Sequence, residues 1–203
     1  MKIDLKHAND IVKTIADELA KNEDFISDLD QKIGDGDHGY NIVRGFKAVL
    51  EIDSTNLSLD NYFMQIGRTL MAKVGGASGP LYGMSFMKAA AAFKNSEYID
   101  FQNFKEFVAN FAKNLQILGK VQLNEKTMYD VWNPFCTKLS EFNEINLEAK
   151  NELLEYLQYL VVQTKDMMAT KGRASYLKER SIGTIDPGSF STGIILKNFL
   201  KEL

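Results

Sequence analysis

The apolar residues of this chain recur mostly at steps of three and four, the spacing that puts side chains on one face of an α-helix. The longest such stripe lies within residues 147–171 and runs from Leu153 to Met167 and Met168. We expect one long helix there, with Met168 and the rest of the stripe in the core. Similar patterns predict helices over residues 6–20, 23–31, 39–52, 59–74, 81–94, 101–118, 127–141 and 188–203.

The strand pattern, in which apolar and polar residues alternate, is nearly absent. There is no internal repeat or Gly/Ser linker, so connections are short and neighbouring helices should be antiparallel. Pro80 and Pro187 stand beside glycines at segment boundaries, where each could occupy the first position of a helix. We therefore predict an all-α fold: a single domain over residues 1–203, built as a closed barrel or bundle of about eight antiparallel helices.

The composition, with 45% apolar and 25% charged residues, is that of an ordinary globular protein. The single cysteine, Cys136, excludes an intramolecular disulfide and a multi-thiolate metal site. No signal peptide or membrane-length apolar run is evident, so we expect a cytoplasmic protein without a membrane partner. A net charge of −3 gives no electrostatic case for nucleic acid, and any bound phosphate needs local help.

The stretch KIGDGDHGYN matches the G-x-G-x-x-G pattern of dinucleotide-binding loops but carries Asp35 and Asp37 as spacers. No Val/Ile-rich strand precedes it, and carboxylates would repel a phosphate. Together with Asp30, from the last turn of a preceding helix, these aspartates instead suit Mg²⁺, which binds carboxylates and phosphates together. The alternative is an acidic capping loop with Asp37 as the N-cap of the next helix. His38 could be a ligand, a proton-transfer group or a structural histidine.

The stretch VGGASGPLYG places three glycines just before Pro80. Free amides at a helix N-terminus can bind an anion without a positive side chain. Ser78 could cap this helix or bind phosphate, and paired glycines also occur where helices pack closely. The stretch is therefore a candidate phosphate site.

A third stretch, KGRASYLKERSIGTIDPGSFSTG, gathers Lys171, Arg173, Lys178 and Arg180 among glycines. The planar guanidinium of arginine suits phosphate oxygens and the charge that develops in phosphoryl transfer, although a basic run is often only a solvated surface. With an acidic metal loop and a helix N-terminus, the basic stretch completes a set of groups for a magnesium nucleotide.

These motifs, together with EKTMYDVWNP, resemble the L (nucleotide-binding) subunit of dihydroxyacetone kinases, DhaL, in the same order along essentially the whole chain. The resemblance implies a barrel of eight antiparallel helices with the nucleotide in loops at one end. It implies Mg²⁺ and ADP or ATP as cofactors, with Asp30, Asp35 and Asp37 as metal ligands. It further implies nucleotide contacts from His38, Gly39, Tyr40, Asn41, Ala77, Ser78, Gly119, Met128, Arg173, Asp186, Pro187 and Gly188.

The resemblance also implies partners: a K subunit that holds dihydroxyacetone and a phosphotransferase-system M protein that recharges bound ADP. Arg173 and the metal aspartates would be the catalytic groups. Two alternatives are an ADP-loaded sensor that docks on a transcription factor and an L-type subunit for another acceptor. The chain departs from the family pattern at Asn124 and Glu125, where Gly-Asp is common, at Lys178, where Gly is common, and at Thr184, where His is common.

Overall fold

The computed structural model describes residues 2–203, and within this range the regular elements are helices, apart from one antiparallel bridge between Ile3 and Ile99. The predicted all-α fold is confirmed. The α-helices are α1 (Leu5–Lys21), α2 (Glu23–Ile33), α3 (His38–Val49), α4 (Leu59–Lys73), α5 (Ser78–Ala89), α6 (Phe101–Gly119), α7 (Tyr129–Ser140), α8 (Leu147–Gln163) and α9 (Pro187–Glu202), and the 3₁₀ segments are η1 (Ala90–Phe93), η2 (Thr164–Asp166) and η3 (Arg173–Ser181).

The prediction of one helix over residues 147–171 is wrong beyond residue 163. Helix α8 ends at Gln163, and Met168 is 42% exposed instead of lying in the core. The physical reason is a competing donor: the Lys126 ammonium bonds the carbonyl oxygens of Thr164 and Met167, which a continuing helix would use for its own N–H groups. Tertiary contact therefore ends a helix that the apolar pattern alone would continue.

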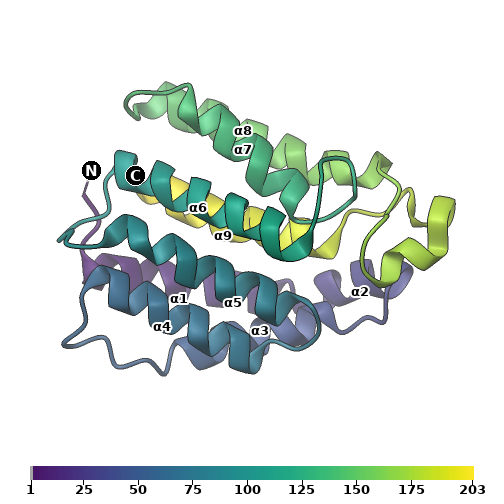
Figure 1. The fold of residues 1–203 in the computed structure, drawn as a ribbon, viewed down its shortest axis with the longest axis horizontal. Helices are drawn as coiled ribbons and strands as arrows, with labels where there is room; N and C mark the ends of the chain where they lie inside the picture. The colour runs from purple at the N-terminus through teal and green to yellow at the C-terminus, as the bar shows by residue number, and fades with distance from the viewer. Residues whose placement is uncertain (1) are drawn as a thin grey trace.

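Eight helices form the closed ring that the sequence predicts. Successive helices from α3 to α9 pack side by side, and α9 and α3 both pack on α1, which completes the circle. Helix α2 stands outside the ring and packs against α3, α9 and η3 (Figure 1). Aromatic side chains fill the centre, including Phe107 stacked on Phe93 and Trp132 stacked on Phe111.

Several of these helices begin at a residue whose side chain caps the N-terminus. Asp4, Asp100 and Asn146 each accept hydrogen bonds from backbone N–H groups in the first turns of α1, α6 and α8. Pro187 is the first residue of α9, as predicted, whereas Pro80 is the third residue of α5 instead of its first. Helix α5 thus begins two residues earlier than the proline suggested.

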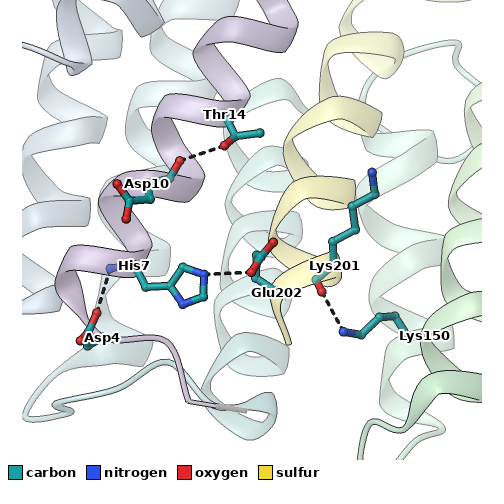
Figure 2. Close-up of polar contacts among 7 residues, drawn as sticks. All are labelled: Asp4, His7, Asp10, Thr14, Lys150, Lys201 and Glu202. Carbon is teal, nitrogen blue, oxygen red and sulfur yellow. Dashed lines mark hydrogen bonds and ion pairs between the residues drawn. The ribbon is translucent and has the colours of Figure 1, made fainter.

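The antiparallel order places alternate loops at opposite ends of the bundle (Figure 1). The chain termini lie at one end, where Glu202 pairs with His7 and the carbonyl of Lys201 accepts a bond from Lys150 (Figure 2). The loops that follow α2, α4, α6 and α8 meet at the other end. Across residues 2–203, every helix is too short or too polar to cross a membrane.

Candidate functional site

A cavity of about 620 Å³ opens at the end of the bundle where these four loops meet. Its wall is built from segments far apart in the chain, from Asp30 to Gly188, because antiparallel helices return every second connection to the same end. The predicted site residues that line it are Asp30, Asp35, Asp37, His38, Ala77, Ser78, Gly119, Met128, Arg173, Asp186, Pro187 and Gly188.

The three aspartates of the first loop converge as predicted. Asp30 comes from the last turn of α2, and Asp35 and Asp37 flank Gly36, whose positive φ of 77° lets the backbone reverse. One carboxylate oxygen from each residue lies within 4.8 Å of the others. Burial raises the pKa of Asp30, and the neighbouring charges of Asp35 and Asp37 raise it further. A hard divalent cation would relieve this repulsion, so the donor set fits Mg²⁺.

The capping alternative does not describe Asp37. Asp37 stands at the N-cap position of α3, but its side chain makes no capping hydrogen bond. Asp30 supplies the cap instead, because its Oδ2 accepts from the His38 backbone N–H at 3.1 Å. The carboxylate of Asp37 is therefore left available to a ligand.

His38 is buried, with both ring nitrogens in hydrogen-bond contact with hydroxyl groups. Nδ1 lies 3.2 Å from Ser78 Oγ, and Nε2 lies 3.0 Å from Ser191 Oγ. Ser191 is in turn bonded to the buried hydroxyl of Tyr82. Burial lowers the pKa of His38 to about 4, so the ring is neutral at physiological pH. The ring joins α3, α5 and α9 and fixes the hydroxyl of Ser78 beside the cavity.

Three other predicted contacts of this loop lie outside the cavity wall. Gly39 packs against α2, since a Cβ there would lie 2.3 Å from the Glu23 carbonyl oxygen. Tyr40 is 59% exposed, and the amide of Asn41 lies against Gly75 and accepts a bond from Arg44. In this structure Gly39 and Asn41 therefore contact neighbouring elements, and Tyr40 is exposed to solvent.

The glycine loop leads into α5, and its residues Gly75, Gly76 and Ala77 line the cavity. Gly76 adopts a φ of 64°, and α5 begins at Ser78 without a side-chain cap. The first N–H groups of α5 are thus open to an anion at the positive end of the helix dipole.

The α8–α9 segment closes the cavity on a third side. Arg173, at the start of η3, pairs with Asp35, and Lys171 also lines the wall. Lys178 and Arg180 line a separate hollow, so only part of the basic run faces the site. At the start of α9, Asp186 accepts from the Ser189 N–H at 2.7 Å, and burial raises the pKa of Asp186 to about 6.

The opposite wall is apolar and contains residues that sequence reasoning missed. Leu81, Leu115, Leu118 and Val121 line it together with Met128 and Gly119. These leucines belong to ordinary helix stripes, and no local signal separates them from core residues. Another missed residue is Lys126, which lines the cavity and yet is only 2% exposed.

Comparison with known proteins matches this arrangement to one family. The model of one protein family, the DAK2 domain, matches residues 32–201. The chain is 39% identical over 187 residues to the ADP-binding subunit DhaL of dihydroxyacetone kinase 1 from Listeria innocua, covering 90% of this chain and 89% of that protein. It is 36% identical to the Escherichia coli DhaL subunit, covering 89% of each. The chain belongs to the DhaL family.

The DhaL fold is also seen in a solved structure. The dihydroxyacetone kinase from C. freundii, in complex with AMP-PNP and Mg²⁺, superimposes with a TM-score of 0.71 at 20% identity. The match covers 96% of this chain but 33% of that longer one, so this DhaL chain spans about a third of it.

Two departures from the DhaL pattern coincide with unusual backbone. Asn124 has a φ of 66° and Lys178 a φ of 53°. Asparagine tolerates the left-handed region, whereas Lys178, with a ψ of −126°, lies where mainly glycine is found. Both positions therefore hold a residue with a side chain in a backbone conformation that favours glycine.

Proposed function

We propose that this chain is the nucleotide-binding subunit of a dihydroxyacetone kinase, which binds Mg-ADP or Mg-ATP and transfers the γ-phosphoryl group to dihydroxyacetone held by a separate K subunit. The observation that carries the proposal is the convergence of Asp30, Asp35 and Asp37 in one cavity with Arg173 and the start of α5. The relatives named as ADP-binding subunits support the choice of nucleotide.

Different residues of the cavity would bind the metal, the phosphates and the base. The three carboxylates would hold magnesium, which when bound neutralises phosphate oxygens. The amides of Ala77 and Ser78 and the guanidinium of Arg173 would bind phosphate, and the apolar wall around Met128 would take the base. The protein then acts by positioning and charge neutralisation, which suits a loose phosphoryl-transfer transition state.

We further propose that the nucleotide stays bound as a cofactor and is recharged by a phosphotransferase-system M protein. Relatives of nearly full length are named as subunits of kinases that depend on phosphoenolpyruvate, which favours such a donor over free ATP. Purification in the presence of Mg²⁺ should then yield protein that retains ADP, detectable by chromatography of the denatured sample. Protein free of nucleotide that phosphorylates dihydroxyacetone from ATP alone, with K, would contradict the cofactor role.

The central test removes the metal ligands. Asp35→Ala combined with Asp37→Ala should abolish Mg-dependent ADP binding in calorimetry, while helical circular dichroism stays unchanged because both residues lie in a loop. Asp53→Ala, in the exposed loop after α3 at the other end of the bundle, is the control. Undiminished binding by the double variant would refute the metal site.

A transfer assay separates the kinase from an ADP-loaded sensor. With K and M proteins, phosphoenolpyruvate and the general phosphotransferase proteins, the kinase produces dihydroxyacetone phosphate at a rate that depends on Arg173. Binding of ADP without any transfer would favour the sensor.

A further inference from the structure

We propose that Lys126 is a positioning residue that locks the α8–α9 segment into the wall of the nucleotide cavity. Its ammonium group donates to the carbonyl oxygens of Thr164 at 2.6 Å, Met167 at 3.2 Å and Thr184 at 2.5 Å. All three donors of the ammonium are thereby used, so Lys126 acts on the site through the segment it holds.

The three carbonyls mark both ends of that segment. Thr164 and Met167 follow the end of α8, and Thr184 comes two residues before the N-cap of α9. One side chain from the α6–α7 loop thus connects the beginning of the α8–α9 segment to its end. Between these points lie Lys171 and Arg173, which have their own contacts at the cavity rim.

Lys126 is itself held by a rigid turn. It has a φ of 59°, and Asp130 fixes the turn by accepting from the backbone N–H groups of Asn124, at 2.5 Å, and Thr127, at 2.8 Å. Asp130 is 2% exposed, so the turn is anchored in the interior of the bundle. The ammonium therefore has a fixed location from which to hold the α8–α9 segment of the wall.

Neighbouring bonds tie the same two loops together. The Thr170 N–H donates to the Glu125 carbonyl at 3.2 Å, and Ser189 Oγ donates to the Thr127 carbonyl at 3.0 Å. The Asp186 N–H donates to the Thr164 hydroxyl at 3.1 Å. Lys126 stands among these bonds, and its charge also faces the carboxylates of Asp186 and Asp166. Without the ammonium, the segment keeps only these neutral hydrogen bonds, and Asp186 loses a buried positive charge beside it.

Only the expected effect of Lys126 on nucleotide binding rests on the proposed function. In the free protein, Lys126→Met should raise amide hydrogen exchange across residues 164–186 by about tenfold, because buried carbonyls lose a charged donor. Exchange in α4 and α6 should stay protected. In calorimetry the same variant should bind Mg-ADP about tenfold more weakly, since the segment must be ordered on binding.

Two further variants make the test decisive. Lys105→Met is the matched control, because Lys105 Nζ also donates to a backbone carbonyl, that of Phe142, but lines no part of the cavity. It should leave exchange in 164–186 and Mg-ADP affinity unchanged. Lys126→Arg keeps the buried charge and so protects folding, but its planar donors cannot serve three carbonyls around one point. It should loosen the same segment, and it decides the matter if Lys126→Met does not fold.

The inference is overturned if both Lys126 variants exchange like the wild type in this segment. It is also overturned if exchange rises equally in α4 and α6, since Lys126 would then serve general stability. A wild-type protein that binds no Mg-ADP would defeat the proposed function, but the exchange result would still judge the role of Lys126.

Discussion

Two single residues, Lys178 and Asp186, lie in unusual environments near the C-terminal part of the chain. Lys178 carries a side chain in a conformation that mainly glycine adopts, and it lies in the segment that follows Arg173. Asp186 is an acid at the buried start of α9. Both are local features whose consequences are measurable one residue at a time.

Lys178→Gly should raise the free energy of unfolding by about 1 kcal/mol, because glycine relieves the strain of the positive φ. Urea denaturation followed by circular dichroism measures the change. Lys120, which ends α6 at a φ of 47° and a ψ of 46°, is the comparison. Its conformation is the ordinary left-handed one, so Lys120→Gly should gain less. Equal gains at both positions would argue against special strain at Lys178.

The pH dependence of stability should carry the signature of Asp186. Burial raises the pKa of Asp186 from 3.8 to about 6; the charge of Lys126 opposes the rise and that of Asp130 adds to it. The folded protein therefore holds more protons than the unfolded chain between about pH 4 and pH 6, so this residue adds stability as the pH falls through 6. As the pH falls from 7 to 5, the free energy of unfolding of the wild type should rise relative to that of Asp186→Asn. A constant difference in unfolding free energy would contradict the raised pKa.

At the scale of elements, glycines set how closely helices approach. Helix α3 packs on α2 through Gly39, where a Cβ would lie 2.3 Å from both the Glu23 carbonyl oxygen and Ser27 Oγ. This approach brings Asp30, on α2, to the first N–H group of α3. Packing of two helices thus sets the geometry of the acidic cluster.

Gly39→Ala should lower the free energy of unfolding by about 2 kcal/mol, because α2 must move away from α3 to admit a methyl group. It should also weaken Mg-ADP binding by displacing Asp30. Gly193→Ala is the control, since its Cβ would meet only a methyl group of Val161 at 2.9 Å. Thermal denaturation and calorimetry measure both effects. Normal stability and affinity in Gly39→Ala would show that the helix contact tolerates a larger residue.

At the scale of the whole molecule, the bundle separates the contacts of its termini from the cavity. His7, Lys150 and Glu202 lie at the end where the chain begins and finishes (Figure 2). The cavity lies at the other end, and its wall joins loops from four places in the chain. Ligand binding there should consequently stabilise the fold as a whole.

Mg-ADP at about 100 times its dissociation constant should add about 2.7 kcal/mol to the free energy of unfolding, because a ligand that binds only the folded state shifts the equilibrium by mass action. Removing the metal with a chelator should reverse the gain. Differential scanning calorimetry measures both steps, and the double variant at Asp35 and Asp37 should show neither. Stabilisation that survives chelation would point to a site that does not need the metal.

The sequence by itself determined the helices and the chemistry of the loops. Apolar spacing is a local property, so it located the helices, and the short connections between them implied an antiparallel bundle or closed ring. Asp30, Asp35 and Asp37 are close enough in the chain to predict their convergence. The tertiary structure decided what depends on distant partners. It ended α8 at Gln163 through the Lys126 ammonium, left Met168 exposed, and put Leu81 and Leu115 into the cavity wall while Tyr40 stayed outside it. These outcomes follow from contacts between residues far apart in the chain, and neither periodicity nor spacing records such contacts.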